Sequence, residues 1–327
     1  MPLALALVMP VALLLALWID RCWGEPPLAV HPVVWIGYYL KACGNFTVRC
    51  PPALAFLLGA LAWVAGALLV GALAWALQAL ALWQLARFIA QPQPAGALAA
   101  AALVAAMAWL LKAMLSWRML TDEVGAVEAA LRQSLPAGRE RLSWLVSRDT
   151  ANLSESQVRE SAIETLAENL NDSVVAPIFW FVLLGLPGAA IYRFANTADA
   201  MWGYRGTYRG QHWEWAGKWA ARADDALSWL PARLTAGLLM GVTGQVQFGA
   251  LRREAARTPS PNSGWPMAAM AMALGVSLGK PGVYTLNATG CAPRAGDVPL
   301  AQKYASKLVL ALVLCVLTAI ILVAWMM

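Results

Sequence analysis

ALAFLLGALAWVAGALLVGALAWALQALALWQLA, residues 53–86, is a run of 34 residues without a charged side chain. Because an α-helix rises about 1.5 Å per residue, a helix of this length extends about 51 Å, beyond the roughly 30 Å of a bilayer's hydrocarbon core. The segment is therefore predicted to be a membrane helix that tilts or protrudes. The sequence QPQP at 91–94 is predicted to end it.

The composition of the whole chain agrees with a membrane protein. Of the 327 residues, 60% are hydrophobic and 13% are charged, and 17 are Trp. We predict an all-α, polytopic integral membrane protein that forms a single membrane domain over 1–327. Within it we expect N-terminal membrane helices over 1–117, a motif-bearing catalytic region over 118–305 and a C-terminal transmembrane helix over 306–327.

Other apolar segments predict further spans and one interruption. Residues 2–19 are long enough to span and lack the flanks of a cleaved signal peptide, which predicts a retained anchor. Residues 95–117 form the next span, in which Lys112 is expected to extend its amine to the membrane surface. Residues 174–191 contain Pro177 and the sequence GLPG, so we expect a broken, re-entrant hairpin that does not cross.

The remaining composition excludes several classes of protein. The net charge is +6, but Lys and Arg form no cluster typical of a nucleic-acid-binding protein. The 5 Cys are scattered and there are only 2 His, so neither a disulfide framework nor a His/Cys zinc site is predicted. The chain has no Walker A motif and no GxSxG elbow. Fourteen of the 18 acidic residues lie within 122–225, where we expect the chemistry.

The polar sequence RDTANLSESQVRESAIETLAENLNDS, residues 148–173, is the main candidate for a site. Ser154 and Gln157 form a helix-capping pattern, and acidic residues recur at every fourth position from Glu160 to Asp172. A solvated acidic face is the simpler interpretation, but polar groups near a bilayer are usually functional. We expect Glu160 to be solvated. The residues nearest the membrane segment, which we assign to the site, are Glu164, Glu168, Asn169 and Asp172.

A second polar group follows the broken segment. Asn196 and Asp199 share one helical face, and Arg222, Asp224 and Asp225 fall within four residues. Adjacent acids repel each other unless a cation lies between them, and Mg²⁺ is commonly held by one or two carboxylates together with phosphates. The alternative is a helix N-terminal turn stabilised by the helix dipole. Four cations could neutralise phosphate, namely Arg148, Arg205, Lys218 and Arg222. The alternative is that each of them lies exposed at the membrane interface.

The sequence SPNSGWP, residues 260–266, predicts a helix that starts at Pro266 and is capped by Asn262 or Ser263. Its free N–H groups would favour an anion, although capped turns are common in proteins. Composition and spacing thus indicate a site of carboxylates, amides and arginines at a membrane, which suits Mg²⁺ and phosphate chemistry.

Several sequence blocks resemble, in order, the signatures of the cobalamin-biosynthesis membrane proteins CobD/CbiB. The blocks are RDT (148–150), ETLAENLND (164–172), AP (176–177), NTADAMWGY (196–204), ARADD (221–225), LPARL (230–234), SPNSGWPMAAMA (260–271) and KPGVY (280–284). Near the N-terminus, Asp20, Gly24, His31 and Gly37 also match, whereas Glu25 replaces the usual Asp.

This resemblance implies an adenosylcobinamide-phosphate synthase of cobalamin (vitamin B12) biosynthesis. Such an enzyme is a ligase that joins adenosylcobyric acid to aminopropanol phosphate, or aminopropanol, by an ATP-dependent amide bond. The resemblance implies ATP as a substrate, Mg²⁺ as a cofactor and a site on the cytoplasmic side of the bacterial inner membrane. Other membrane enzymes of late cobamide assembly, and a second copy of the chain, are the protein partners to consider.

The residues are assigned roles on this basis. Glu164 or Asp149 would take the proton from the attacking amine, and Asn169 and Asn196 would orient substrate amides. The expected Mg²⁺ ligands are Asp172, Asp224 and Asp225. The expected catalytic residues are Glu164, Glu168, Asp149, Asn169 and Asp199. The expected substrate- and phosphate-binding residues are Arg148, Asn196, Arg205, Lys218, Arg222, Ser260, Asn262 and His31.

Two other classes of protein stay open. A Mg²⁺-dependent, prenyltransferase-like membrane enzyme would need repeated NDxxD-type blocks, and ENLND at 168–172 is one partial copy. A non-catalytic membrane signalling protein similar to AmpE would share the scaffold. It would not need Arg148, Asp172, Asp199 and the two acids at 224 and 225 together. Neither class explains the SPNSGWPMAAMA block.

Overall fold

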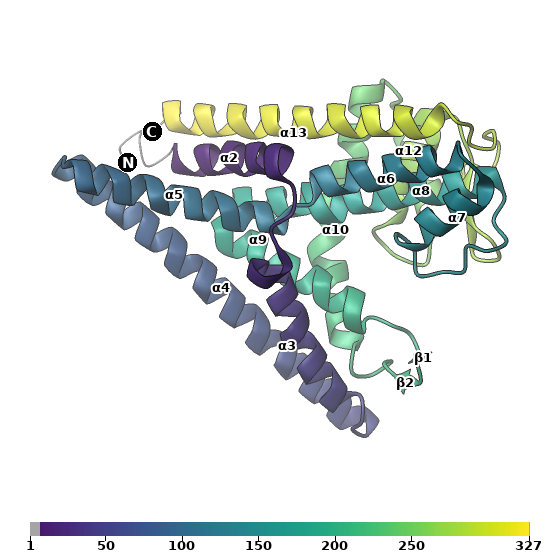
Figure 1. Ribbon diagram of the computed structural model, residues 1–327, viewed down its shortest axis with the longest axis horizontal. Coiled ribbons are helices and arrows are strands. Elements are labelled where there is room, and N and C mark those ends of the chain that lie inside the picture. The colour runs from purple at the N-terminus through teal and green to yellow at the C-terminus, as the bar shows by residue number, and fades with distance from the viewer. Residues whose placement is uncertain (1–6, 327) are drawn as a thin grey trace. The chain divides into compact units, whose positions relative to one another are not determined.

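The computed structural model describes residues 7–326 of the chain, with side chains for 7–319, and most of this part is helical (Figure 1). Contacts divide the chain into two compact units, which are described separately. The first comprises Met1–Ser116, Ala176–Leu227 and Val316–Met327. The second comprises Trp117–Val175 and Ser228–Cys315.

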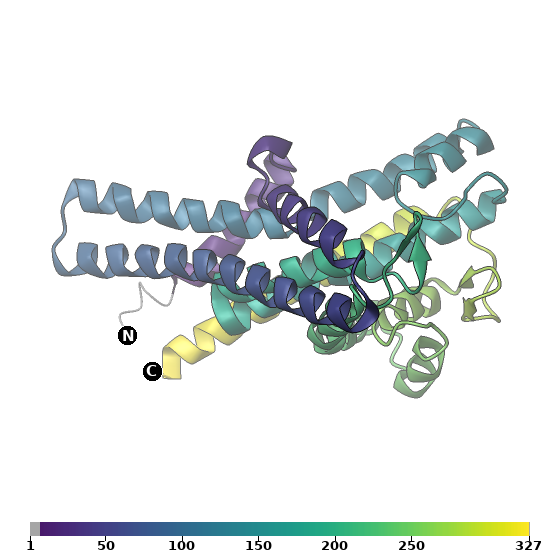
Figure 2. The ribbon, with the colours of Figure 1, turned by 90° about the horizontal axis from the view of Figure 1, so that it is seen from below.

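The first unit is built on one long helix, α4. The elements of this unit are α2 Val8–Trp23, a 3-10 turn Leu28–Val30, α3 Pro32–Thr47, α4 Pro52–Ala90, α5 Pro94–Met114, α9 Ala176–Trp202, β1 Thr207–Tyr208, β2 Gln211–His212 and the start of α10 Lys218–Thr243. Helix α4 has 39 residues, and the next helix starts at Pro94, so the predicted long span and its end at QPQP are confirmed. Helices α4 and α5 run side by side (Figure 2).

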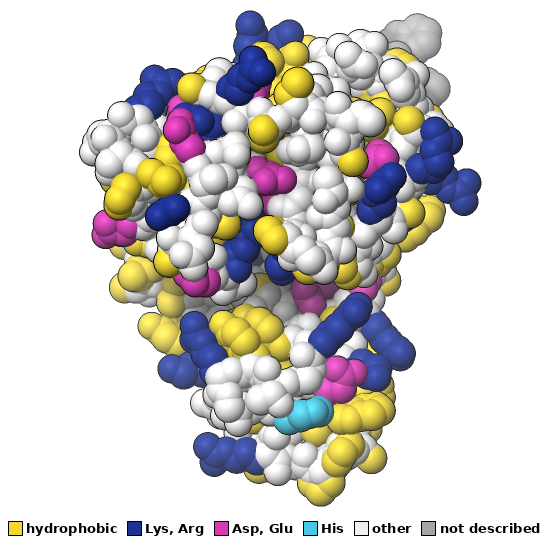
Figure 3. All heavy atoms as spheres, turned by 90° about the vertical axis from the view of Figure 1, so that its right-hand side faces the viewer, with side chains coloured by type: hydrophobic (Ala, Val, Ile, Leu, Met, Phe, Trp, Pro, Cys, Tyr) yellow, Lys and Arg dark blue, Asp and Glu magenta, His cyan; other side chains and the backbone are white. Residues whose placement is uncertain are grey.

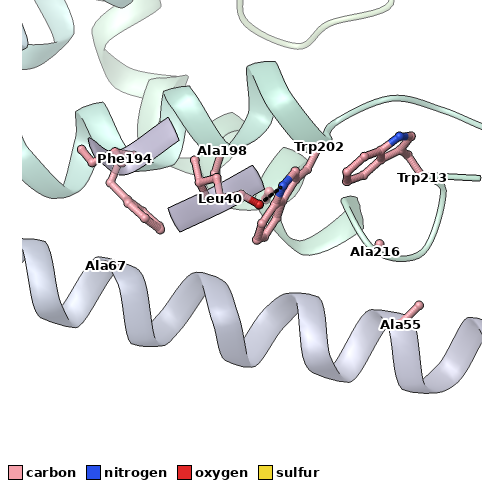
Figure 4. Close-up of a cluster of buried hydrophobic side chains, with 10 residues drawn as sticks. Leu40, Ala55, Ala67, Phe194, Ala198, Trp202, Trp213 and Ala216 are labelled. Carbon is pink, nitrogen blue, oxygen red and sulfur yellow. Dashed lines mark hydrogen bonds between the residues drawn. The ribbon is translucent and has the colours of Figure 1, made fainter. Parts of the chain in front are cut away.

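Small residues along α4 allow aromatic side chains to pack closely in the first unit (Figure 4). Ala67 is buried on α4, and a Cβ added to Gly66 would collide with the ring of Phe194. Trp202 is 1% exposed, and its indole N–H donates a hydrogen bond of 3.1 Å to the carbonyl oxygen of Leu40. Since a buried indole needs such a partner, α3 and α9 are fixed to each other at this point.

The predicted break in the GLPG sequence is confirmed at Gly185, whose φ is +71°. The N–H of Leu186 donates a hydrogen bond of 2.7 Å to the side-chain oxygen of Gln78 on α4. A Cβ added to Gly188 would collide with the carbonyl oxygen of Trp180, although residues eight apart in a straight helix are about 12 Å apart. The chain therefore turns back sharply between Trp180 and Gly188, and the non-helical residue is Gly185. That the segment does not cross the bilayer stays a prediction.

Four helices of the described part are long and apolar enough to cross a membrane. They are Pro52–Ala90, Pro94–Leu131, Glu155–Trp202 and Asp297–Ala319. Large apolar side chains such as Leu68 and Trp75 are about two-thirds exposed on α4 (67% and 64%), as expected of a surface that faces lipid. The predicted all-α, polytopic membrane fold is thus confirmed. The predicted first span is helical from Val8, and residues 2–6 of it lie outside the described residues.

The second unit is organised around α8. The elements of this unit are α6 Trp117–Leu131, α7 Leu135–Ser143, α8 Glu155–Leu170, a π-helical turn Asn171–Val175, the rest of α10, α11 Phe248–Ala255, α12 Gly264–Leu274, β3 Leu278–Lys280, β4 Tyr284–Leu286 and most of α13 Asp297–Met326. The predicted capping box is confirmed, because Ser154 and Gln157 exchange hydrogen bonds at the start of α8. Arg159 of α8 pairs with buried Glu128 of α6 at 2.8 Å, which joins the two helices.

If residues 174–191 form a hairpin that does not cross, the chain on either side of it must lie on one face of the membrane. We expect cysteines placed at the exposed positions Ser143 and Gly210 to react with a membrane-impermeant thiol reagent from the same side. The measurement uses a background in which the 5 native Cys are replaced. Labelling of the two positions from opposite sides would contradict the hairpin.

Candidate functional site

A polar cavity of about 210 Å³ lies in the second unit, between α8 and the β3–β4 hairpin. Its charged lining residues are Arg148, Glu164, Glu168 and Lys280. Three of these come from the polar stretch predicted to hold the site, and Asn169 lines the cavity with them. The cavity therefore places two carboxylates and two cations around a small volume.

Helix α8 presents its side of the cavity through residues spaced by about one turn. Glu164 is 6% exposed, accepts a hydrogen bond of 2.9 Å from the Tyr284 hydroxyl and lies 3.5 Å from an Arg148 nitrogen. Arg148 also donates to the hydroxyl of Ser161, one turn earlier on α8. Burial raises the pKa of Tyr284, and the nearby Glu164 carboxylate raises it further, so the hydroxyl stays a hydrogen-bond donor. The carboxylate of Glu164 is thus held between a cation and a phenol.

The opposite wall is a tight hairpin, in which Lys280 and Tyr284 are directly paired. The N–H of Val283 donates 2.9 Å to the carbonyl oxygen of Lys280, and Gly282 has a φ of +73°. Pro281 before this glycine is the pattern of a type II turn. Because opposite residues of an antiparallel pair share a face, Lys280 and Tyr284 both face the cavity. Neither was predicted as a site residue, although KPGVY carries the turn signal.

Three further residues of the polar stretch, Glu160, Asp149 and Asp172, do not line the cavity. Glu160 is partly buried, so the prediction that it is solvated is wrong. Asp149 is exposed, and its carboxylate accepts a hydrogen bond of 2.9 Å from the N–H of Ala151, which stabilises a turn outside the cavity. Asp172 lies in the π-helical turn and accepts a hydrogen bond of 2.8 Å from the amide of buried Asn171.

The second predicted group lies in the first unit. The Asn196 amide on α9 donates a hydrogen bond of 3.5 Å to the Asp224 carboxylate on α10, so these two predicted residues are brought together. Burial raises the pKa of the neighbouring Asp225, and Arg205 partly offsets that rise. Asp199 lies so close to Gly203 that a Cβ at this glycine would collide with its carboxylate. The fold thus gathers carboxylates and an amide at the junction of α9 and α10.

The predicted phosphate-binding cations of the first unit have different surroundings. Lys218 pairs with Glu214 at 3.5 Å and lies 4.2 Å from the centre of the Trp215 ring, so two neighbours already engage its charge. Arg205 and Arg222 are exposed. The positive charge of Arg205 lowers the pKa of Asp225, which partly offsets the effect of burial.

The predicted Mg²⁺ ligands belong to different units. Asp224 and Asp225 are in the first unit and Asp172 is in the second. Within the described residues, no group of three or more His, Cys, Asp or Glu side chains could hold a metal ion. Mg²⁺ in phosphate-transfer sites commonly takes one or two carboxylates, with phosphate oxygens and water completing its shell. Asp224 and Asp225 are the two predicted ligands that lie in one unit.

A buried ion network in the first unit contradicts one prediction. Lys112 does not reach a membrane surface, because its side chain is 0% exposed and lies 3.1 Å from Asp20 and 2.9 Å from Glu25. His31, predicted to bind phosphate, lies 3.2 Å from Glu25 and accepts the N–H of Val33 as the N-cap of α3. Burial raises the pKa of Glu25, but its hydrogen bonds to His31 and Lys112 outweigh burial and lower it.

The predicted anion-binding turn is also arranged differently. The helix begins at Gly264 and not at Pro266, and no side chain caps it. The hydroxyl of Ser260 accepts the N–H groups of Asn262 and Ser263, both at 3.2 Å, so it stabilises the turn itself. The Asn262 side chain accepts a hydrogen bond of 2.9 Å from Arg233. The predicted side-chain caps are absent because Pro266, the third helical residue, has no N–H to donate, and the N–H of Trp265 donates to the carbonyl oxygen of Asn262 at 3.0 Å.

The fold and the polar groups define a helical membrane protein whose carboxylates, amides and arginines gather in two sites. On one face, Lys and Arg side chains lie among Asp and Glu side chains and do not form one basic patch (Figure 3). A family model described as CobD/Cbib protein matches residues 13–325. The chain therefore belongs to the CobD/CbiB family.

Curated relatives agree over most of the chain. The cobalamin biosynthesis protein CobD of Chromobacterium violaceum is 42% identical over 291 residues, which cover 84% of this chain and 81% of that protein. The probable cobalamin biosynthesis protein CobD of Methanothermobacter thermautotrophicus is 39% identical over 280 residues, which cover 84% and 85%. That of Pyrococcus furiosus is 38% identical over 295 residues, which cover 90% and 93%. No solved structure matches the chain.

Proposed function

We propose that the protein is an adenosylcobinamide-phosphate synthase of cobalamin biosynthesis. It joins adenosylcobyric acid to aminopropanol phosphate, or aminopropanol, by an amide bond at the expense of ATP. Family membership supports this proposal, and the observation that carries it is the cavity in which Glu164 and Glu168 face Arg148 and Lys280. Amide ligation needs such a combination, because an amine, a phosphate and a proton must all be handled there.

The reaction has two steps. A carboxylate oxygen of adenosylcobyric acid attacks the γ-phosphorus of ATP, which forms an acyl phosphate and releases ADP. The amine nitrogen then attacks the acyl carbon, the C–N bond forms, and phosphate leaves with the bonding electrons of the C–O bond. The bound ammonium group loses two protons. In our proposal Glu164 accepts one, which leaves the nitrogen free to attack, and the leaving phosphate takes the other as the C–N bond forms. The hydrogen bond from Tyr284 and the ion pair with Arg148 hold the Glu164 carboxylate in place.

The first unit is proposed to bind the transferring phosphoryl group. Mg²⁺, when bound, offsets negative charge on this group. Asp224 and Asp225 would hold the ion, and Asn196 fixes Asp224 through its amide. Arg205 and Arg222 are exposed cations that can neutralise phosphate oxygens. Each guanidinium group can donate two parallel hydrogen bonds to one phosphate. Because ATP is cytoplasmic, we also propose that the protein lies in a bacterial inner membrane with its site on the cytoplasmic side.

We expect the substitution Asp225→Asn to lower the rate of amide formation at least tenfold, because an amide binds Mg²⁺ more weakly than a carboxylate. Membrane insertion and the amount of folded protein should not change. The measurement is product formation by membranes at increasing Mg²⁺. The matched control is Asp122→Asn, which alters an exposed surface pair. An undiminished rate in Asp225→Asn would count against the metal role.

Complementation tests the function itself. A strain blocked after cobyric acid grows when given cobinamide but not cobyric acid. If the proposal is correct, this chain restores growth on cobyric acid. Failure to restore growth, while the protein is found intact in the membrane, would contradict the proposed function.

A further inference from the structure

We propose that the cavity between α8 and the β3–β4 hairpin binds the amine substrate as a small alkylamine phosphate. Lys280 would hold the phosphate, and Glu164 and Glu168 would hold the amine. The proposal rests on the proposed function and deepens it, because it assigns one substrate to one cavity and adds a binding residue. All residues involved belong to the second unit.

The charges around the cavity match a molecule that carries both signs. Arg148 and Lys280 attract phosphate, while Glu164 and Glu168 attract an ammonium group. A nucleotide triphosphate brings only negative charge, so two carboxylates in the same cavity would repel it. A free amine would satisfy the carboxylates and leave the cations without a partner in the ligand. An alkylamine phosphate satisfies both.

The volume of the cavity agrees with a small ligand. It measures about 210 Å³. Pockets for drug-sized molecules measure roughly 300–1,000 Å³, so this cavity suits a molecule much smaller than a nucleotide or a corrinoid. Of the proposed substrates, only the amine, with or without its phosphate, is this small.

The depths of the charged groups give the ligand an orientation. Glu164 is buried at 6% exposure, whereas Lys280 is exposed at the end of its strand. Among the described residues, the side-chain amine of Lys280 has no hydrogen bond or ion pair, and its positive charge interacts with the negative charge of Glu164. A phosphate at the rim keeps part of its hydration, which lowers the cost of binding it. The amine then points inward, toward the carboxylate proposed to accept its proton.

The hairpin holds Lys280 in position without help from a ligand. Its turn is closed by the Val283 hydrogen bond. The hairpin is fastened to α8 by the Tyr284 hydroxyl, which donates a hydrogen bond to Glu164. A binding group on a fixed turn loses little freedom when the ligand arrives, which favours affinity.

The experiment compares two amines on the full-length protein in membranes. We expect Lys280→Ala to raise the KM for aminopropanol phosphate about 10- to 100-fold, the effect of losing one charge-assisted hydrogen bond. The KM for aminopropanol and the KM for ATP should change less than about twofold on the same reasoning. Lys280→Arg should restore most of the loss. The matched control is Lys303→Ala, an exposed lysine outside the cavity, which should leave all three values unchanged.

The outcomes separate this proposal from the proposed function. A rise in the KM for ATP, or equal losses for both amines, would overturn the assignment of the cavity to the alkylamine phosphate. If the unsubstituted protein forms no amide with either amine, the proposed function fails. Calorimetric titration of the purified protein with aminopropanol phosphate then still tests the cavity. Binding that is lost in Lys280→Ala and kept in Lys303→Ala supports it, and equal binding by both variants contradicts it.

Discussion

The substitution Lys112→Ala is expected to lower the free energy of unfolding by about 3–5 kcal/mol, a large fraction of the roughly 5–15 kcal/mol that keeps a typical protein folded. The Lys112 amine lies 3.1 Å from Asp20 and 2.9 Å from Glu25, and Asp20 is 1% exposed. Without the amine, Asp20 and Glu25 lose the cation that lies close to both of them, although Glu25 keeps its contact with His31. Removing one partner of a buried ion pair costs far more than the pair contributes, because the other charge stays desolvated.

The measurement is the midpoint of thermal unfolding in detergent, followed by the fluorescence of the 17 Trp. The matched control is Lys41→Ala, an exposed lysine on α3, which should unfold like the original protein. A triple variant, Lys112→Met with Asp20→Asn and Glu25→Gln, should recover most of the lost stability, because no uncompensated charge remains. If Lys112→Ala unfolds at the original temperature, the network does not stabilise the fold.

The same network gives a pH dependence. The folded-state pKa of Glu25 is lowered, despite burial, by its hydrogen bonds to His31 and Lys112. The stability from this group is therefore present above the ordinary pKa of a glutamate and is lost as the pH falls through the lowered value. The triple variant should lose this part of the acid sensitivity.

The second large effect is expected for Glu164→Gln, which should lower the turnover number about 10²- to 10⁴-fold, the usual contribution of a positioned base. A glutamine keeps the shape of the side chain and can still accept the Tyr284 hydrogen bond, so folding and the KM for ATP should change little. Product formation at saturating substrates is the measurement. Glu160→Gln, one turn earlier on α8 and outside the cavity lining, is the matched control. A full rate in Glu164→Gln would remove this residue as the proton acceptor.

Features set by neighbouring residues could be predicted from the sequence. The long charge-free helix, its end at QPQP, the capping box at Ser154 and the break at Gly185 all follow from local rules about charge, proline and glycine. Likewise, Asn196 and Asp199 were placed on one helix by their spacing. In these cases the deciding interactions span only a few residues.

Features set by distant partners could not be predicted. A lysine near the end of an apolar helix usually extends toward water, and nothing near Lys112 in the sequence shows that Asp20 and Glu25 come to meet it. Lys280 and Tyr284 were missed as site residues because their strands are only three residues long, too short for a clear alternating pattern. These two residues face α8 because of contacts such as that between Tyr284 and Glu164, which are more than a hundred residues apart along the chain.

The small-residue face of α4 has a consequence for how this helix tolerates sequence change. Its buried positions are Ala55, Gly59, Gly66, Ala67, Gly71, Ala74 and Ala81, and Ala67, Ala74 and Ala81 are seven residues apart. Residues seven apart lie on nearly the same side of a helix, so these alanines share one face of α4. A larger side chain on this face would push the neighbouring helix away, whereas Leu, Val or Phe can replace one another on the lipid side. The buried face of α4 therefore accepts only the smallest residues, whereas its lipid-facing side accepts any large apolar residue.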